Sequence, residues 1–208
     1  MPVSLGLTEA IGNAGERKID PQSPTLRQVG GPTEDDVIGP YYRRCAPYRA
    51  KISPALAPGK VLVISGRIWS FRLKQPIADS ILDVWQANAD GHYDNEDPAN
   101  PPPVNSYINR ARVRCDSQGY YELETIYPGA YRMDEHTWRS PHLHFLVRAL
   151  GYRTLVTQLF FEGAPYLDSD PFVKPSLTIP LNEITVGMDR FQFGAFDIAL
   201  ADDIGEAG

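Results

Sequence analysis

The sequence of 208 residues has few of the residues that mark a disulfide scaffold or a membrane protein. Its two cysteines, Cys45 and Cys115, are too few and too far apart for a disulfide framework or a cysteine-rich zinc site. No apolar run approaches the ~20 residues that span a bilayer, and residues 1–20 contain no apolar stretch typical of a secretory signal. We therefore expect a cytoplasmic protein without a membrane partner.

Basic residues are also in deficit. Lys and Arg number 20 against 26 Asp and Glu, which gives a formal net charge of −6. Proteins that bind nucleic acids usually present an excess of basic side chains to the phosphates, so we expect no nucleic-acid partner. A small anionic substrate is still compatible with this charge, because one local arginine can outweigh the charge of the whole chain.

The chain is instead rich in turn-forming residues and tyrosine, with 19 proline, 17 glycine and 11 tyrosine residues. Residues 1–36 are polar and contain many of these glycines and prolines, which predicts an extended N-terminal arm. Short β-branched or alternating apolar and polar runs predict strands at 61–71, 81–87, 112–115, 120–126, 142–148, 154–161 and 191–198. We predict an all-β fold, an antiparallel β-sandwich over residues 37–208, with long loops such as 94–105.

Histidine is scarce, and two of the four histidines lie close together in the sequence. His142 and His144 are separated by one residue in a predicted strand, so both imidazoles project from the same face. Such a pair also arises by chance on exposed strands. The apolar residues around it indicate burial, however, where two imidazoles need partners, and this favours two ligands of one metal ion.

Further ligands have to come from elsewhere in the chain. No Asp or Glu has the spacing of a two-histidine, one-carboxylate iron site or follows His144 as in a cupin. Tyrosine is the remaining donor, and a phenol with a pKa of about 10 is deprotonated at neutral pH only beside a strongly Lewis-acidic cation such as Fe(III). The residues alone do not choose among the candidates, each of which is individually more typical of a packed aromatic: Tyr93, Tyr131, Tyr41, Tyr42, Tyr48, Tyr120 and Tyr121.

Four motifs taken in order are more specific than the histidine pair. They are DVWQANADGHY at 83–93, PGAY at 128–131, WRSPHLHF at 138–145 and TQLF at 157–160, preceded by IGPYY at 38–42. With this set the sequence resembles the intradiol ring-cleaving dioxygenases, in particular the catalytic subunit of the protocatechuate 3,4-dioxygenase branch. The resemblance extends over about residues 35–195 and implies a β-sandwich, in agreement with the predicted strands.

The resemblance also implies roles for individual residues. It implies four ligands of a non-haem ferric ion: Tyr93, Tyr131, His142 and His144. It implies three catalytic residues. Tyr131 would accept a substrate proton, Arg139 would stabilise charge on the ring, and Gln158 would hydrogen-bond near the iron. It implies a substrate site lined by Gly39, Tyr41 and Arg139.

The activity implied is cleavage of a catechol-type, protocatechuate-like diol with O2 to a cis,cis-muconate-type diacid. One alternative keeps this chemistry and changes the substrate to hydroxyquinol or a substituted catechol, because the stretch between Tyr131 and Trp138 departs from the protocatechuate enzymes, which favour an aromatic residue near Met133. The alternative from another class is a metal-free β-sandwich that binds a ligand. The expected partners are the small aromatic diol and O2, within a homo-oligomer or a hetero-oligomer with a related subunit.

Overall fold

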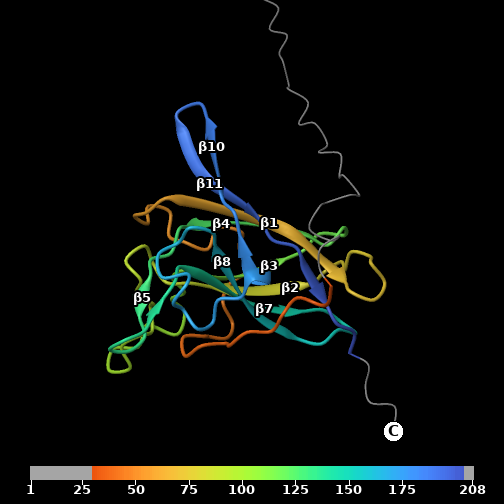
Figure 1. Cartoon of the computed structure of the whole chain (residues 1–208), viewed down its shortest axis with the longest axis horizontal. Helices are drawn as coiled ribbons and strands as arrows, with labels where there is room; N and C mark the ends of the chain where they lie inside the picture. The colour runs from red at the N-terminus through yellow and green to blue at the C-terminus, as the bar shows by residue number, and fades with distance from the viewer. Residues whose placement is uncertain (1–29, 204–208) are drawn as a thin grey trace, which may run out of the picture.

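The computed structural model describes residues 30–203, and its strands form two facing sheets (Figure 1). Residues 1–29, which make up most of the predicted arm, and residues 204–208 lie outside the described part of the chain. The first sheet has five strands around the long strand β1. These strands are β10 (Asn182–Val186), β11 (Asp189–Ala195), β1 (Val61–Ser70), β12 (Ile198–Leu200) and β4 (Tyr120–Ile126).

The second sheet also has five strands and carries the histidine pair. In order across the sheet they are β3 (Arg110–Arg114), β2 (Ile81–Trp85), β7 (His142–Arg148), β8 (Leu155–Phe161) and β9 (Thr178–Ile179). A separate short hairpin joins β5 (Tyr131–Arg132) to β6 (Trp138–Arg139), and a 3-10 turn, η2 (Pro175–Leu177), precedes β9. None of the helical turns within residues 30–203 has the length and apolar character of a membrane-spanning helix.

The prediction of an all-β sandwich is confirmed, with a mixture of strand directions. β1 pairs with β4 in antiparallel fashion but with β11 and β12 in parallel, and β8 pairs with β9 in parallel. Parallel neighbours need a long crossover connection, and β11 and β12 follow β1 by more than a hundred residues. The region predicted as one strand at 191–198 forms parts of two strands, because the first part of β1 pairs with β11 and its last part pairs with β12.

Alternate side chains of β7 face opposite sides of the second sheet. Leu143, Phe145 and Val147 are completely buried in the core between the two sheets. His142 and His144 occupy the intervening positions and therefore face the outer side of this sheet. The histidine pair thus lies outside the main hydrophobic core, although both rings are buried.

The segment of residues 30–50 covers that outer side. The backbone N of Asp36 donates a hydrogen bond to the carbonyl oxygen of Val156 in β8 at 2.8 Å. Further along, the backbone N of Arg112 in β3 donates to the carbonyl oxygen of Pro47, also at 2.8 Å. In Figure 1 the segment, drawn in orange, passes below β7 on the side away from β1. The chain therefore crosses the sheet from β8 to β3 over the histidines.

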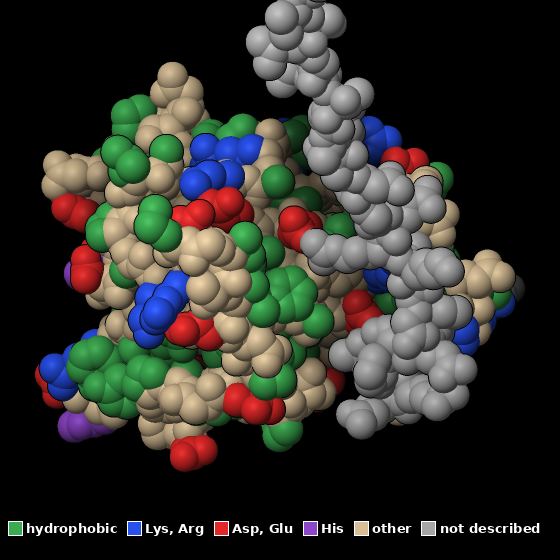
Figure 2. All heavy atoms as spheres, turned by 90° about the horizontal axis from the view of Figure 1, so that it is seen from above, with side chains coloured by type: hydrophobic (Ala, Val, Ile, Leu, Met, Phe, Trp, Pro, Cys, Tyr) green, Lys and Arg blue, Asp and Glu red, His purple; other side chains and the backbone are tan. Residues whose placement is uncertain are grey.

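The exposed surface mixes charges of both signs. On the face seen in Figure 2, acidic and basic side chains are interspersed, and basic residues form no continuous stripe. Figure 1 shows that the hairpin of β10 and β11 extends beyond the rest of the first sheet. Four of the five residues of β10 have side chains that are exposed, which explains why the sequence pattern did not predict this strand.

Gly66 is the position at which β1 changes its parallel partner. Ser65 pairs with Ala195 of β11, and Ile68 pairs with Ile198 of β12. A Cβ atom on Gly66 would lie 1.9 Å from the carbonyl oxygen of Phe196, which connects these two strands. No side chain fits there unless the backbone moves.

We expect Gly66→Ala to lower the free energy of unfolding by about 2–3 kcal/mol, because the added methyl group overlaps a backbone carbonyl. Urea unfolding followed by fluorescence measures the change. Gly31→Ala is the matched control, since its Cβ would meet nothing within 4 Å. Equal stabilities of the two variants would contradict this account of the strand exchange.

Candidate metal centre

Two neutral imidazoles meet on the covered side of β7. His142 and His144 are 2% and 1% exposed, and their Nε2 atoms lie 3.1 Å apart. His142 Nδ1 lies 2.6 Å from the carbonyl oxygen of Ser140, which assigns the proton to Nδ1 and leaves a lone pair on Nε2. Burial lowers the pKa of His142 to about 3 and that of His144 well below its ordinary value. Both rings are therefore uncharged at neutral pH and able to bind a cation.

Two tyrosine rings complete a cluster with these imidazoles. The Tyr93 ring centroid lies 6.4 Å from that of His144, and the Tyr131 centroid lies 5.7 Å from that of His142. The two tyrosine rings are 5.6 Å apart at an angle of 88°. Burial raises the pKa of both phenols, while the nearby Arg139 opposes this effect. The Tyr93 hydroxyl is buried and has no hydrogen-bond partner within residues 30–203, which is unusual for a polar group unless it binds something else.

Two glycine-containing turns bring Tyr93 and Tyr131 together. Gly91 has a φ of +89°, and a Cβ atom there would lie 2.3 Å from the carbonyl oxygen of Ala130. From the other turn, the backbone N of Gly129 donates to a carbonyl oxygen in the turn before Tyr93 at 2.8 Å. The glycines of the DGHY and PGAY motifs thus let the two backbones touch, and the tyrosine two positions after each glycine places its phenol in the cluster.

A buried guanidinium borders the cluster. Arg139 is 3% exposed, and its Nε lies 3.0 and 3.2 Å from the two carboxylate oxygens of Asp170. One terminal nitrogen of Arg139 lies 3.4 Å from the hydroxyl of Tyr131. Asp170 also accepts backbone hydrogen bonds from Ser140 at 2.8 Å and Phe172 at 2.9 Å. The carboxylate therefore fixes the direction in which the guanidinium points.

The sequence did not identify Asp170 as part of this site. Asp168 and Asp170 look alike in the sequence, yet the first is exposed and the second is buried. An indirect signal does exist, because a buried arginine requires a buried anionic partner. That rule predicts that a carboxylate lies beside Arg139 without saying which one.

Gln158 connects this guanidinium to the covering segment. Its side chain is completely buried, and it lies opposite His144 in the pairing of β7 with β8. Gln158 Oε1 accepts a hydrogen bond from Arg139 at 2.6 Å, and its Nε2 donates to the carbonyl oxygen of Val37 at 3.1 Å. Both ends of the amide are therefore held.

The covering segment also brings Gly39 and Tyr41 to the cluster. Gly39 has a φ of +68°, and a Cβ atom on it would lie 3.2 Å from Cε1 of His144. The Tyr41 ring stacks on that of Tyr93, with centroids 4.3 Å apart and an angle of 22° between the planes. It meets Tyr131 edge-on at 6.3 Å. The structure thus brings together every residue to which the family resemblance gave a role. The other candidate tyrosines lie elsewhere: Tyr42 packs on Trp85, the exposed Tyr48 packs on Arg112, and Tyr120 and Tyr121 belong to β4 in the other sheet.

This set of donors fits a hard and highly charged metal ion. Within residues 30–203, no group of three or more His, Cys, Asp or Glu side chains could hold a metal ion. A metal ion at the two imidazoles therefore needs the phenol oxygens as further ligands. Phenolates are anionic oxygen donors, and the buried, unpartnered hydroxyl of Tyr93 is available for this role.

Comparisons with known proteins give a consistent picture. A protein-family model described as Dioxygenase matches residues 37–202. The chain is 32% identical over 192 residues to a chlorocatechol 1,2-dioxygenase of Rhodococcus opacus, which covers 82% of this chain and 73% of that protein. It is 33% identical over 162 residues to a 6-chlorohydroxyquinol 1,2-dioxygenase of Cupriavidus pinatubonensis, covering 67% and 54%. A protocatechuate 3,4-dioxygenase beta chain of Burkholderia cepacia is 36% identical over 118 residues, covering 54% and 49%.

The chain therefore spans from about half to about three quarters of the length of these curated relatives. Among solved structures, 3-chlorocatechol 1,2-dioxygenase from Rhodococcus opacus 1CP superposes with a TM-score of 0.76 at 28% identity, covering 82% of this chain and 73% of that one. The dioxygenase domain of a dioxygenase carbohydrate-binding fusion from Streptomyces sp. SirexAA-E has a TM-score of 0.68 at 30% identity, covering 83% and 99%.

We expect Asp170→Asn to destabilise the fold by about 3 kcal/mol or more, because it leaves the buried Arg139 charge without its anionic partner. The exposed Asp168→Asn is the matched control, and we expect it to change stability by less than about 0.5 kcal/mol. Thermal and urea unfolding of both variants provide the comparison. Similar stabilities would mean that the ion pair of Arg139 and Asp170 does not hold this part of the site.

Proposed function

Because the chain belongs to the intradiol ring-cleaving dioxygenase family, we propose that it is an iron-dependent enzyme that cleaves a catechol-type diol with O2. The product is a muconate-type diacid, formed by cleavage between the two hydroxyl-bearing carbons. One observation carries the proposal, namely the buried cluster of Tyr93, Tyr131, His142 and His144. A metal-free binding module does not account for this cluster, and the relatives support the enzyme.

The four residues of the cluster would hold a non-haem ferric ion. Bound there, the ion would supply Lewis-acid chemistry that polarises the diol. The two histidines are well prepared for this task, since burial keeps them neutral and Ser140 orients the ring of His142.

Tyr131 is the residue of the cluster best suited to accept a proton from the substrate. It begins the short strand β5 and is less buried than Tyr93. Its hydroxyl lies 3.4 Å from a guanidinium nitrogen of Arg139, which stabilises the phenolate form needed for a base. Tyr93 lies deeper and has the role of a permanent ligand.

Arg139 and Gln158 prepare the pocket for negative charge. Arg139 is a fixed cation in a site from which water is largely excluded, so it stabilises charge that develops on the ring during the reaction. Asp170 prevents this guanidinium from turning away, and Gln158 holds its other side. Together these contacts preorganise the electrostatic environment before the substrate arrives.

A second candidate substrate class is a substituted catechol without a carboxylate, or hydroxyquinol. Two of the relatives are named for chlorocatechol and 6-chlorohydroxyquinol. A protocatechuate-type ring needs a cation for its carboxylate, yet Arg43 is hydrogen-bonded to Asp94 and Arg49 to backbone carbonyl oxygens. Arg44, Arg132 and Arg153 are further candidate cations for a ring carboxylate, so the second substrate class rests on the named relatives.

Three further expectations remain proposals. The division into an arm, residues 1–36, and a catalytic domain, residues 37–208, is supported by a family match that begins at residue 37. A homo-oligomer or a hetero-oligomer with a related subunit, and a location in the cytoplasm, are the other two. Size-exclusion chromatography with light scattering tests the assembly.

We expect the iron-loaded protein to consume one O2 for each diol cleaved, with the diacid as the only product. Oxygen-electrode traces and product spectra with catechol, 4-chlorocatechol, hydroxyquinol and protocatechuate rank the substrates. The iron-loaded protein should also have a broad visible absorption band from tyrosinate ligands. Protein that binds no iron and consumes no O2 with any of the four would instead support a metal-free binding module.

We expect Tyr131→Phe to reduce kcat by about 100-fold or more, which is the usual contribution of a positioned acid or base. Tyr48→Phe is the matched control, because the exposed Tyr48 ring packs on Arg112 away from the cluster and phenylalanine preserves that contact. Steady-state kinetics and iron analysis of both variants make the measurement. Full turnover and full colour in Tyr131→Phe would contradict the role given to this residue.

A further inference from the structure

A second buried guanidinium lies near Tyr93, on β3, which is separated from β7 by β2 in the sheet. Arg110, the first residue of β3, is 1% exposed and pairs across the sheet with Trp85. Its Cζ atom lies 6.0 Å from the centroid of the Tyr93 ring. The family motifs identified in the sequence do not include this residue, and neither the fold nor the proposed reaction explains why a charge is buried there.

Arg110 binds two segments around Tyr93, the loop that follows it and the segment that covers it. Its Nε donates to a carboxylate oxygen of Asp94 at 2.7 Å, and one terminal nitrogen donates to Oδ1 of Asn95 at 2.5 Å. These are the two residues that follow Tyr93 in the chain. The other terminal nitrogen donates to the carbonyl oxygen of Tyr41, whose ring stacks on that of Tyr93. One guanidinium therefore holds the loop that carries Tyr93 and the segment that covers it.

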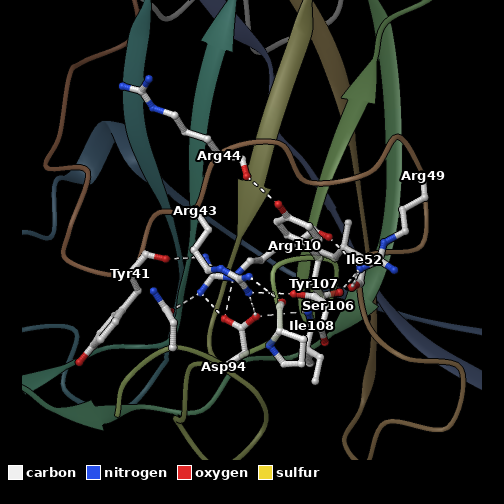
Figure 3. A network of polar contacts seen from close by, with 12 residues as sticks. Tyr41, Arg43, Arg44, Arg49, Ile52, Asp94, Ser106, Tyr107, Ile108 and Arg110 are labelled. Atoms are coloured by element: carbon white, nitrogen blue, oxygen red, sulfur yellow. Dashed lines mark hydrogen bonds and ion pairs between the residues drawn. The ribbon is translucent and has the colours of Figure 1, made fainter. Parts of the chain in front are cut away.

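Asp94 receives a second guanidinium in the same network (Figure 3). A terminal nitrogen of Arg43 lies 2.8 Å from the other carboxylate oxygen of Asp94. The side chains of Arg43, Asp94 and Arg110 are 16%, 3% and 2% exposed. Arg49 donates to the carbonyl oxygen of Arg110 at 2.8 Å, which fixes the backbone of this strand end.

The charges in this network do not cancel. Two guanidinium groups face one carboxylate, which leaves a net charge of +1 close to the Tyr93 ring. A further acidic group near Tyr93 is Glu96, which accepts a hydrogen bond from the Tyr93 backbone N and is paired with His92. The Glu96 side chain is 39% exposed, so solvent screens it far more than the buried Arg110.

We propose that Arg110 is a positioning residue that orients Tyr93 in the candidate metal centre and stabilises the negative charge of its phenolate. The inference rests on the proposed function, because it takes Tyr93 as a ligand of ferric iron. Asp94 connects the two guanidinium groups and limits how much positive charge reaches the ring. Removal of Arg110 and removal of the Asp94 charge should therefore act in opposite directions.

The visible absorption of the iron-loaded protein reports on this charge. The band arises when light moves an electron from a tyrosinate to the ferric ion, so a nearby cation raises the energy required. We expect Arg110→Met to move the band to longer wavelength and Asp94→Asn to move it to shorter wavelength. Coulomb's law for a unit charge 6.0 Å from the ring and an effective dielectric constant of ~20 gives a shift on the order of 20 nm.

Two further variants separate charge from simple loss of structure. Arg110→Lys keeps the positive charge, and we expect its band to lie close to that of the wild type even where iron affinity falls. Arg114→Met removes an arginine from the same strand whose side chain is 64% exposed and paired with Asp79, and we expect no shift. If Arg110→Met fails to fold, Asp94→Asn alone decides the sign.

The outcomes are distinguishable. Bands that move in the same direction in Arg110→Met and Asp94→Asn, or that do not move at all, would overturn the inference and leave these residues with a structural role. A wild-type protein that binds iron without any visible band would instead contradict the proposed function. Wild-type colour with opposite shifts in the two variants supports both.

Discussion

The two imidazoles of β7 lie on a sheet face that the rest of the chain has to cover. A strand projects alternate side chains to opposite faces. Because Leu143, Phe145 and Val147 of β7 face the main core, His142 and His144 lie on the other face, outside it. A polar ring that is removed from water needs compensating partners. The segment of residues 30–50 and the stack of Trp85 on His144, at 4.8 Å, supply that cover. The low pKa values of both histidines follow from it.

Buried ion pairs hold the loops that meet on this covered face. Arg139 with Asp170 and Arg110 with Asp94 are both nearly inaccessible to solvent. A buried pair adds little net stability, because both charges lose their hydration, but it is strongly directional when each partner makes further hydrogen bonds. Each of these pairs binds backbone or side-chain atoms from several segments. They therefore fix loop positions that hydrophobic packing alone leaves undetermined.

The parts of this molecule that local periodicity encodes could be predicted from the sequence. The strands at 61–70, 81–85, 120–126, 142–148 and 155–161 alternate or carry β-branched residues and were predicted. The two-residue strands β5, β6 and β9 are too short for a periodic signal, and β10 buries almost nothing. Their positions depend on partners that are distant in the chain.

The same distinction applies to the candidate site. The histidine pair followed from strand geometry, whereas the choice of Tyr93 and Tyr131 among the tyrosines required the family resemblance. Their meeting depends on contact between two turns about forty residues apart, through Gly91 and Gly129, and no local pattern encodes it. Asp170 is 31 residues from Arg139 and was missed for the same reason.

Burial also determines the chemistry of the candidate site. It keeps both imidazoles and both phenols neutral, so a cation has to displace two phenolic protons to bind. In the proposed centre, a trivalent ion would offset that displacement better than a divalent ion, because it attracts two phenolates more strongly, and this favours ferric iron as the proposed metal.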